Sequence, residues 1–212
     1  MRKDLLSVAD LTGEEIQSLL RDTVAMKARA LSPLLEGKVL ALLFEKPSLR
    51  TRVSFEVAMH FIGGHTVGFA EPKTASVEKG ENLADTVRTV EGYVDALIVR
   101  HPMEGAARFA AEVASKPVIN AGSGGEEHPT QAMLDLYTLI KEKGRVDGLN
   151  IAIVGDLKYG RTVYSLLYAL SKYSPRVWLA SPPQLKIRRE VLLDLKAHLD
   201  VSEHEKLEEI VG

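Results

Sequence analysis

One feature of the sequence limits the possible folds more than any other: short apolar runs alternate with amphipathic helical stretches. The run Lys38–Phe44 is apolar at nearly every position, which is typical of a strand buried on both faces of a sheet. Stretches with helical periodicity lie on either side of it, at Glu14–Leu31, with Thr12 as the expected N-cap, and at Thr51–Ile62. Strands that alternate with helices predict a parallel sheet covered on both faces. The expected fold class is α/β, a doubly wound parallel sheet.

The alternation continues through most of the chain. The further expected strands are Thr66–Phe69, Asp95–Arg100, Val118–Asn120, Ile151–Val154 and Val177–Ala180. The further expected helices are Glu81–Tyr93, Glu104–Ser115, Pro129–Lys141, Arg161–Tyr173 and Gln184–His198. Glycines 144 and 148 mark the predicted boundary between one domain at residues 1–143 and a second at residues 149–212. The second domain shows only two clear strands, few for a sheet, so we expect the chain to be a fragment or to rely on a partner chain.

Composition excludes several classes of protein. The chain of 212 residues is 45% hydrophobic with a formal net charge of −2, which gives no reason to expect nucleic acid or a membrane surface as a partner. It contains no cysteine, which excludes disulfides, thiolate metal sites and cysteine nucleophiles and fits a reducing compartment. No apolar run approaches the ~20 residues of a membrane helix, and the N-terminus lacks a signal-peptide core. A cytoplasmic location is expected.

Cations or hydrogen-bond donors follow most of the expected strands, at the edge of a parallel sheet where ligands bind. In chain order they are Ser48, Arg50, Thr51 and Arg52; Ser76 and Lys79; Arg100; His128 and Gln131; and Lys158 and Arg161. Such a site is rich in cations and poor in nucleophiles. It favours electrostatic and orientational catalysis on a phosphate-bearing electrophile, without a covalent enzyme intermediate.

The most specific of these clusters opens a helix. Ser48 is expected at the N-cap, where its hydroxyl and the backbone N–H groups form the positive end of the helix dipole. Arg50 and Arg52 in the first turn oppose that dipole, where acidic residues would gain roughly 0.3–1 kcal/mol. A bound dianion would reverse the penalty. The alternative is that both arginines lie on the surface or pair with Glu45 and Glu56.

The other candidates have structural alternatives too. A single histidine such as His128 is more often structural than catalytic, Arg100 could pair with a nearby carboxylate, and Lys79 could be solvated. The glycines of Gly155–Arg161 lack the spacing of a dinucleotide fingerprint, and no Walker motif, metal-ligand cluster or Ser/His/Asp arrangement occurs.

Several of these segments resemble one known family. Phe44–Glu56 resembles the Ser-Thr-Arg-Thr-Arg signature of the aspartate/ornithine carbamoyltransferase family. Four further segments resemble its motifs in the same order: Arg100–Pro102, Gly105–Arg108, His128–Gln131 and Gly155–Thr162. The resemblance runs from the first helix to about Tyr173 and weakens beyond it.

The motifs distinguish two branches of this family. Arg100–Pro102, Ser76–Glu81 and Gly155–Thr162 are similar to the aspartate branch, whereas Phe44–Lys46 and Gly63–His65 have an ornithine-like character. The resemblance therefore favours the aspartate branch. It implies transfer of the carbamoyl group of carbamoyl phosphate to the amine of L-aspartate, in pyrimidine biosynthesis, without cofactor or metal.

The resemblance also assigns roles. Ser48, Arg50 and Thr51 would bind the phosphate of carbamoyl phosphate, and Arg100 would bridge the phosphate and the carbonyl oxygen. His128, together with Thr51, would polarise the carbonyl group.

Four further residues acquire roles in the same way. Gln131 would orient the carbamoyl amide, and Arg161 would hold a carboxylate of aspartate. Ser76 and Lys79 would reach into a neighbouring subunit's site, which implies a homotrimer with shared active sites, and a regulatory chain is a possible further partner.

The sequence departs from the family in two ways. Leu49 replaces the usual threonine, which should keep the backbone donors but removes a hydroxyl. The family also continues well past residue 212: its later arginine, its His-Pro-Leu-Pro loop and its returning C-terminal helix have no counterpart, so we expect an incomplete second α/β domain. An ornithine-type enzyme, and a non-catalytic carbamoyl-phosphate-binding paralogue without a full acceptor domain, remain open alternatives.

Overall fold

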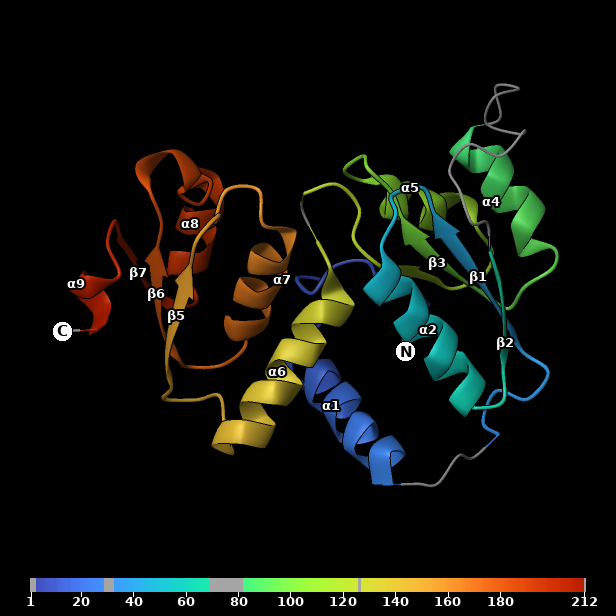
Figure 1. Ribbon diagram of the computed structural model, residues 1–212, viewed down its shortest axis with the longest axis horizontal. Coiled ribbons are helices and arrows are strands. Elements are labelled where there is room, and N and C mark those ends of the chain that lie inside the picture. The colour runs from blue at the N-terminus through green and yellow to red at the C-terminus, as the bar shows by residue number, and fades with distance from the viewer. Residues whose placement is uncertain (1–2, 29–32, 69–81, 126, 212) are drawn as a thin grey trace. The chain divides into compact units, whose positions relative to one another are not determined.

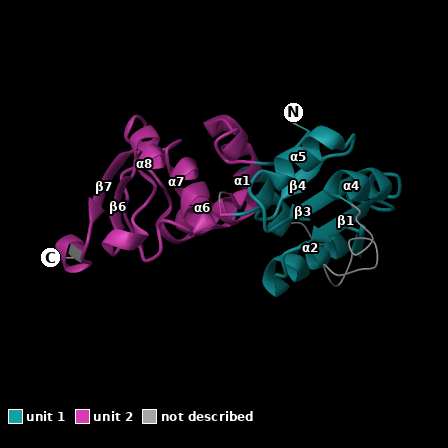
Figure 2. Ribbon diagram, turned by 90° about the horizontal axis from the view of Figure 1, so that it is seen from above, with its two compact units in different colours: residues 1–6, 21–124 teal, residues 7–20, 125–212 magenta. Residues whose placement is uncertain are grey.

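The chain forms two compact α/β units. The computed structural model describes residues 3–28, 33–68, 82–125 and 127–211. One unit comprises residues 1–6 and 21–124, and the other residues 7–20 and 125–212 (Figure 2). Each is described by itself below.

The first unit is built on a four-stranded parallel sheet. Its strands are β1 (Val39–Phe44), β2 (His65–Gly68), β3 (Ala96–Arg100) and β4 (Val118–Asn120). They lie in the order β2-β1-β3-β4, with Leu42 beside Ile98 and Phe44 beside Arg100. The four strands expected in this part of the chain, and their parallel direction, are confirmed.

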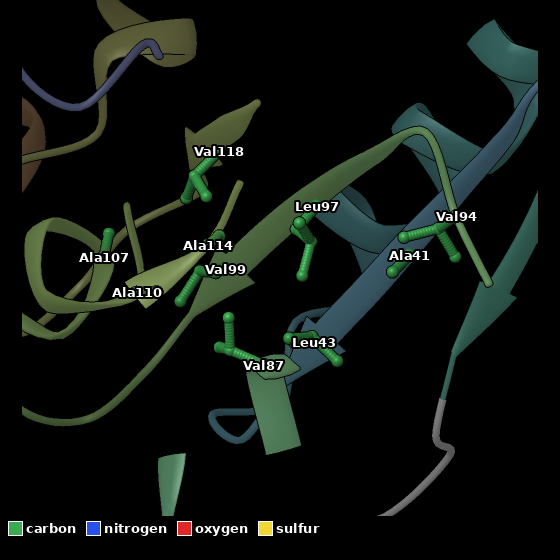
Figure 3. Close-up of a cluster of buried hydrophobic side chains, with 10 residues drawn as sticks. All are labelled: Ala41, Leu43, Val87, Val94, Leu97, Val99, Ala107, Ala110, Ala114 and Val118. Atoms are coloured by element: carbon green, nitrogen blue, oxygen red, sulfur yellow. The ribbon is translucent and has the colours of Figure 1, made fainter. Parts of the chain in front are cut away.

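Helices cover both faces of this sheet (Figure 1). They are α2 (Leu49–Phe61), α4 (Leu83–Glu91) and α5 (Ala106–Val113). Side chains on one face of β1 and β3 pack with α4 and α5 around a buried cluster (Figure 3): Ala41, Leu43, Val87, Val94, Leu97, Val99, Ala107, Ala110, Ala114 and Val118. The alternate residues of the same strands pack with α2: Leu40, Leu42, Phe44, Met59, Ile98 and Ala121. Burial on both faces explains why β1 reads as a continuous apolar run, and it confirms the doubly wound arrangement.

Asp95 fixes the turn that enters β3. Its carboxylate accepts the backbone N–H of Val39 and the ammonium of Lys38, each at 2.9 Å. These two interactions lower the pKa of Asp95 from its ordinary value of 3.8. Because the pKa is lower in the folded state, the ionised carboxylate stabilises the fold above the ordinary pKa, and this contribution is lost as the pH falls through the folded value.

We therefore expect the stability gap between the protein and its Asp95→Asn variant to depend on pH. The gap should be largest near neutral pH and should shrink below about pH 4, because both forms then carry a neutral side chain. Thermal unfolding at a series of pH values measures it, and Asp85→Asn, at an exposed position with a looser 3.9 Å ion pair to Arg88, is the control. A gap that stays constant with pH would contradict the assignment.

The second unit contains a three-stranded parallel sheet. Its strands, β5 (Asn150–Val154), β6 (Arg176–Ala180) and β7 (Asp200–His204), lie in the order β5-β6-β7. The helices that belong to it wholly are α6 (Pro129–Lys143), α7 (Arg161–Leu170), the 3₁₀ turn η1 (Pro183–Leu185), α8 (Arg189–Lys196) and α9 (Glu208–Val211). Helix α1 (Gly13–Ala28) begins in this unit, and Thr12 and Glu15 form the expected N-cap: each backbone N–H is bound by the other's side chain, at 2.9 and 3.1 Å.

Two expectations for this unit are wrong. The count of two strands missed β7, because its sequence is polar and only Val201 is buried in it, so no apolar run marks it. The helix expected at Gln184–His198 is broken between η1 and α8. The carbonyl of Leu185 accepts the backbone N–H of Leu157 at 3.0 Å instead of continuing a helix.

The compact units divide before α6, whereas the sequence places the domain boundary after it. Helix α6 buries Ala132 and Leu136 and groups with the second unit. The two compact units are defined by contacts between residues, whereas the predicted domains are defined by the sequence pattern, and the two boundaries need not coincide. The domains at residues 1–143 and 149–212 therefore stay a prediction.

Within the described ranges, no helix is both long and apolar enough to cross a lipid bilayer.

Candidate active site

The carboxyl ends of β1 and β3 meet at one edge of the first sheet. Phe44 and Arg100 lie side by side in the register, and the backbone N–H of Glu45 donates to the carbonyl of Arg100 at 2.9 Å. The loop after β1 therefore starts beside Arg100, and it leads directly into α2. This juxtaposition is the one expected from strands that run parallel.

Ser48 is the N-cap of α2, as the sequence predicts. Its backbone is extended (φ −160°, ψ 102°), and its hydroxyl donates to the Thr51 hydroxyl at 3.0 Å rather than capping a backbone N–H. The first turn contains no acidic residue. Leu49, which departs from the threonine expected from the resemblance, is 80% exposed, so its side chain leaves the helical backbone undisturbed. Two hydroxyls and the positive end of a helix dipole thus lie together, which suits an anion.

The two arginines of this turn differ in their partners. Arg52 Nε lies 2.8 Å from Glu56 Oε1, so the structural alternative holds for Arg52. Arg50 is exposed, and its guanidinium has no hydrogen bond or ion pair within the described residues. Glu45 pairs with His101 and not with either arginine. The charge of Arg50 is therefore available to bind an anionic ligand.

Arg100 is held below the surface at the end of β3. It is 7% exposed, and its Nη1 donates to the carbonyl of Ala121 at 2.6 Å. That carbonyl lies just after β4, so the side chain reaches along the edge of the sheet. A charge this deeply buried is expensive unless its donors are used, which is consistent with a site for an anion.

The neighbouring His101 is buried and pairs with the partly exposed Glu45, a contact that the sequence did not single out. His101 Nε2 lies 2.8 Å from Glu45 Oε2, while its Nδ1 accepts the backbone N–H of Met103 at 3.0 Å. Because Nδ1 is an acceptor, a neutral ring with its proton on Nε2 satisfies both contacts. His101 thus anchors the start of the loop after β3.

A tight loop follows β4. Asn120 Oδ1 accepts the backbone N–H groups of Gly122 and Ser123, at 2.9 and 3.0 Å. Gly124 has φ +58°, and a Cβ there would lie 2.7 Å from backbone atoms of Glu104, so this position requires glycine. The Ser123 hydroxyl is buried and has no hydrogen-bond partner within the described part of the chain.

His128 and Gln131 open α6 in the second unit. Pro129 is in the first turn, as expected, and His128, only 7% exposed, is the N-cap. The backbone N–H of His128 donates to the Ser165 hydroxyl at 2.7 Å, and its Nδ1 lies 3.3 Å from the Thr130 hydroxyl. Gln131 Nε2 donates to Asp135 Oδ1 at 3.1 Å.

Two carboxyl groups in this region are desolvated. Burial raises the pKa of Asp135, although the hydrogen bond from Gln131 opposes the shift. Burial also raises the pKa of Glu127, against hydrogen bonds from Ser165, Ser7 and the backbone of Val8. The sequence analysis assigned no role to Glu127. Its position directly before the candidate residue His128 is the sequence feature that could have drawn attention to it.

Arg161 is the first residue of α7, where the sequence put it. Burial lowers the pKa of its guanidinium. The preceding loop is tightly closed: Asp156 Oδ1 accepts the backbone N–H groups of Lys158 and Tyr159 at 3.1 and 3.0 Å. A Cβ on Gly160 would lie 2.6 Å from the Asp156 carbonyl, so the entry to α7 requires glycine.

The sequence-predicted residues are thus divided between the units. Ser48, Arg50, Thr51 and Arg100 lie in the first unit, and His128, Gln131 and Arg161 in the second. Ser76 and Lys79 lie outside the described residues. In the described ranges, no group of three or more histidine, aspartate or glutamate side chains could hold a metal ion.

Comparison with known proteins gives consistent matches. The family model described as "Aspartate/ornithine carbamoyltransferase, carbamoyl-P binding domain" matches residues 3–141. Among curated proteins, the aspartate carbamoyltransferase catalytic subunits of Cenarchaeum symbiosum and Methanopyrus kandleri are each 51% identical to this chain. Each alignment covers 99% of this chain and 69% of the relative.

Solved structures agree with the sequence matches. The catalytic subunit of Methanocaldococcus jannaschii aspartate transcarbamoylase superposes with a TM-score of 0.90 at 46% identity, over 98% of this chain and 70% of that chain. Aspartate transcarbamoylase from Trypanosoma cruzi, solved with carbamoyl phosphate and aspartate, gives a TM-score of 0.94 at 39% identity, over 99% and 69%. This chain therefore spans about 70% of the length of these relatives.

Proposed function

The chain belongs to the aspartate/ornithine carbamoyltransferase family, and from that premise we propose that it transfers the carbamoyl group of carbamoyl phosphate to L-aspartate. The products are N-carbamoyl-L-aspartate and phosphate, a step of pyrimidine biosynthesis. The observation that carries this proposal is the 51% identity, over nearly the whole chain, to aspartate carbamoyltransferase catalytic subunits. The match to a structure solved with carbamoyl phosphate and aspartate supports the same substrates.

The start of α2 is the proposed phosphate site. The Ser48 and Thr51 hydroxyls lie 3.0 Å apart at the positive end of the helix, and Arg50 supplies an available charge in the same turn. Hydroxyl donors, the helix dipole and a guanidinium together suit a phosphate dianion.

The carbonyl group of the substrate needs donors where negative charge develops during attack. We assign this role to Arg100, which also contacts the phosphate, and to Thr51 and His128. The aspartate amine attacks the carbonyl carbon, the bond from that carbon to the phosphate oxygen breaks, and the departing phosphate accepts the proton of the amine. Fixed donors lower the barrier because they stabilise the oxyanion without reorganising.

Two residues are assigned to recognition of the remaining groups. Gln131 donates its amide N–H to Asp135, which leaves its amide oxygen to accept from the carbamoyl NH₂ group. Arg161 is proposed to hold a carboxylate of aspartate through a charge-assisted hydrogen bond.

We also propose a homotrimer with shared active sites, in which Ser76 and Lys79 serve a neighbouring copy. An apolar stripe on α2 supports a packed partner: Leu49, Val53, Val57 and Phe61 recur every four residues and are between 43% and 80% exposed. A second copy of this chain is the occupant we infer for that stripe. The cytoplasmic location and a regulatory chain stay predictions.

The proposal is tested by supplying carbamoyl phosphate with either aspartate or ornithine. We expect N-carbamoylaspartate and phosphate with aspartate and no turnover with ornithine, measured by product chromatography and phosphate release. Turnover with ornithine alone would overturn the assignment of the acceptor. Binding of carbamoyl phosphate without turnover of either amine would favour a non-catalytic carbamoyl-phosphate-binding protein.

A further inference from the structure

A partly buried carboxylate joins three segments of the second unit. Glu127 Oε1 accepts the Ser7 hydroxyl at 2.7 Å, and Glu127 Oε2 accepts the Ser165 hydroxyl at 2.5 Å. The backbone N–H of Val8 also favours the ionised form of this carboxylate. The N-terminal turn, the loop before α6 and helix α7 are thus tied to one side chain.

Ser165 links this carboxylate to His128. Its hydroxyl donates to Glu127 and accepts the backbone N–H of His128 at 2.7 Å, and it is fully buried. A serine hydroxyl has one proton, so donation to Glu127 fixes the direction of its lone pairs. Glu127 therefore orients the acceptor that holds the backbone of His128.

The same contact fixes the start of α7. Ser165 and Arg161 are four residues apart on this helix, so their side chains lie on one face. Arg161 is the first residue of the helix and lies one turn before Ser165, whose hydroxyl is bound by Glu127. The two residues to which we assign the carbonyl group and the amino-acid carboxylate are connected through Ser165.

A carboxylate is a costly way to hold two segments together. Burial of an ionised group is unfavourable unless donors surround it, and Glu127 accepts two hydroxyl groups beside the backbone N–H of Val8. An anchor for the N-terminal turn alone would need only Ser7 and Val8. The contact with Ser165 is not required for that anchor. Through Ser165 it connects Glu127 to His128, the N-cap of α6.

We propose that Glu127 is a positioning residue: acting through Ser165, it sets the placement of His128 and Arg161 for carbamoyl transfer. This inference rests on the proposed function. Glu127 itself does not contact substrate. Loss of the Glu127–Ser165 contact should therefore lower kcat while leaving the affinity of the phosphate site in the first unit nearly unchanged.

The test compares three variants with the unmodified protein. Ser165→Ala and Glu127→Ala should each lower kcat by about tenfold to a hundredfold, because small displacements of catalytic groups cost rates of that order. Glu127→Gln should restore most of the rate, since its amide oxygen can accept the Ser165 hydroxyl and its NH₂ group can donate to Ser7. In all three, the dissociation constant of inorganic phosphate should change by less than about threefold, a difference well under the 1.4 kcal/mol that corresponds to tenfold.

Matched controls separate positioning from stability. Ser171→Ala makes the same change at the end of α7, where the hydroxyl donates to the Tyr168 carbonyl at 2.8 Å, and Glu142→Ala removes an exposed glutamate of α6. Both should keep wild-type kcat. If Ser165→Ala and Glu127→Ala lowered only the melting temperature, with wild-type kcat in the folded fraction, the positioning role would be overturned. It would also be overturned if Glu127→Gln were as impaired as Glu127→Ala.

A spectroscopic readout keeps this inference separate from the proposed reaction. In the unmodified protein and in Glu127→Gln, the NMR signals of the His128 ring should have nearly the same chemical shifts, and in Ser165→Ala they should move. This comparison needs no turnover. If the unmodified protein were inactive but showed these chemical shifts, the proposed function would be overturned and the coupling of Ser165 to His128 would be retained. If the protein were active but its His128 signals did not move in Ser165→Ala, only the coupling would be overturned.

Discussion

Replacing Arg100 with alanine is expected to lower kcat for carbamoyl transfer by about 10²- to 10³-fold, the cost of removing one donor to a developing oxyanion. The side chain is 7% exposed and oriented by the Ala121 carbonyl at 2.6 Å, so it is fixed before substrate binds. Water could not take over its role, because a preorganised donor in a sheltered site is worth more than a mobile one. Steady-state kinetics with carbamoyl phosphate and aspartate measures the loss.

The control must separate chemistry from folding. Removal of Arg100 leaves the Ala121 carbonyl without that donor, which costs about 1–3 kcal/mol of stability, so the folded fraction of the variant has to be measured by thermal unfolding. Arg88→Ala makes the same substitution in the same unit at an exposed position and should keep wild-type kcat. A folded Arg100→Ala protein with more than about a tenth of wild-type kcat would contradict the role assigned to Arg100.

The strands that the sequence predicts are those marked by a run of apolar residues, whether these are buried, as in β1, or only partly buried, as in β5. Strand β1 is buried on both faces, and β4, at the edge of the first sheet, has the expected bounds. Strand β7 was not predicted because its sequence, Asp200–His204, is polar and contains no apolar run. The break between η1 and α8 was also invisible, since it depends on a hydrogen bond to Leu157, which is distant in the sequence.

In the candidate site, too, local features were predicted from the sequence and long-range contacts were not. Ser48 as an N-cap and Pro129 in the first turn of α6 follow from local helix chemistry, which a short window of sequence contains. The pairing of Glu45 with His101 and the contact of Glu127 with Ser165 join residues 38 to 56 positions apart in the chain. No local pattern encodes such pairs, so neither the pairing of Glu45 with His101 nor a role for Glu127 followed from the sequence.

The second large effect is expected at Arg50. Arg50→Ala should weaken the binding of carbamoyl phosphate by about tenfold to a hundredfold, because a hydrogen bond between charged groups is worth about 1.5–3 kcal/mol. The guanidinium is exposed and has no partner within the described residues, so its removal should leave the melting temperature nearly unchanged. Calorimetric titration with carbamoyl phosphate measures the change in dissociation constant.

Arg52→Ala is the matched comparison in the same turn. Its guanidinium is held by Glu56 at 2.8 Å, so it has less charge available for a ligand, and we expect its loss to weaken binding by less than about threefold. The contrast tests the geometry and not merely the net charge, since both substitutions remove one cation from the start of α2. Equal effects at the two positions would show that the helix end attracts the phosphate through its general field. An unchanged affinity in Arg50→Ala would remove the start of α2 as the phosphate site.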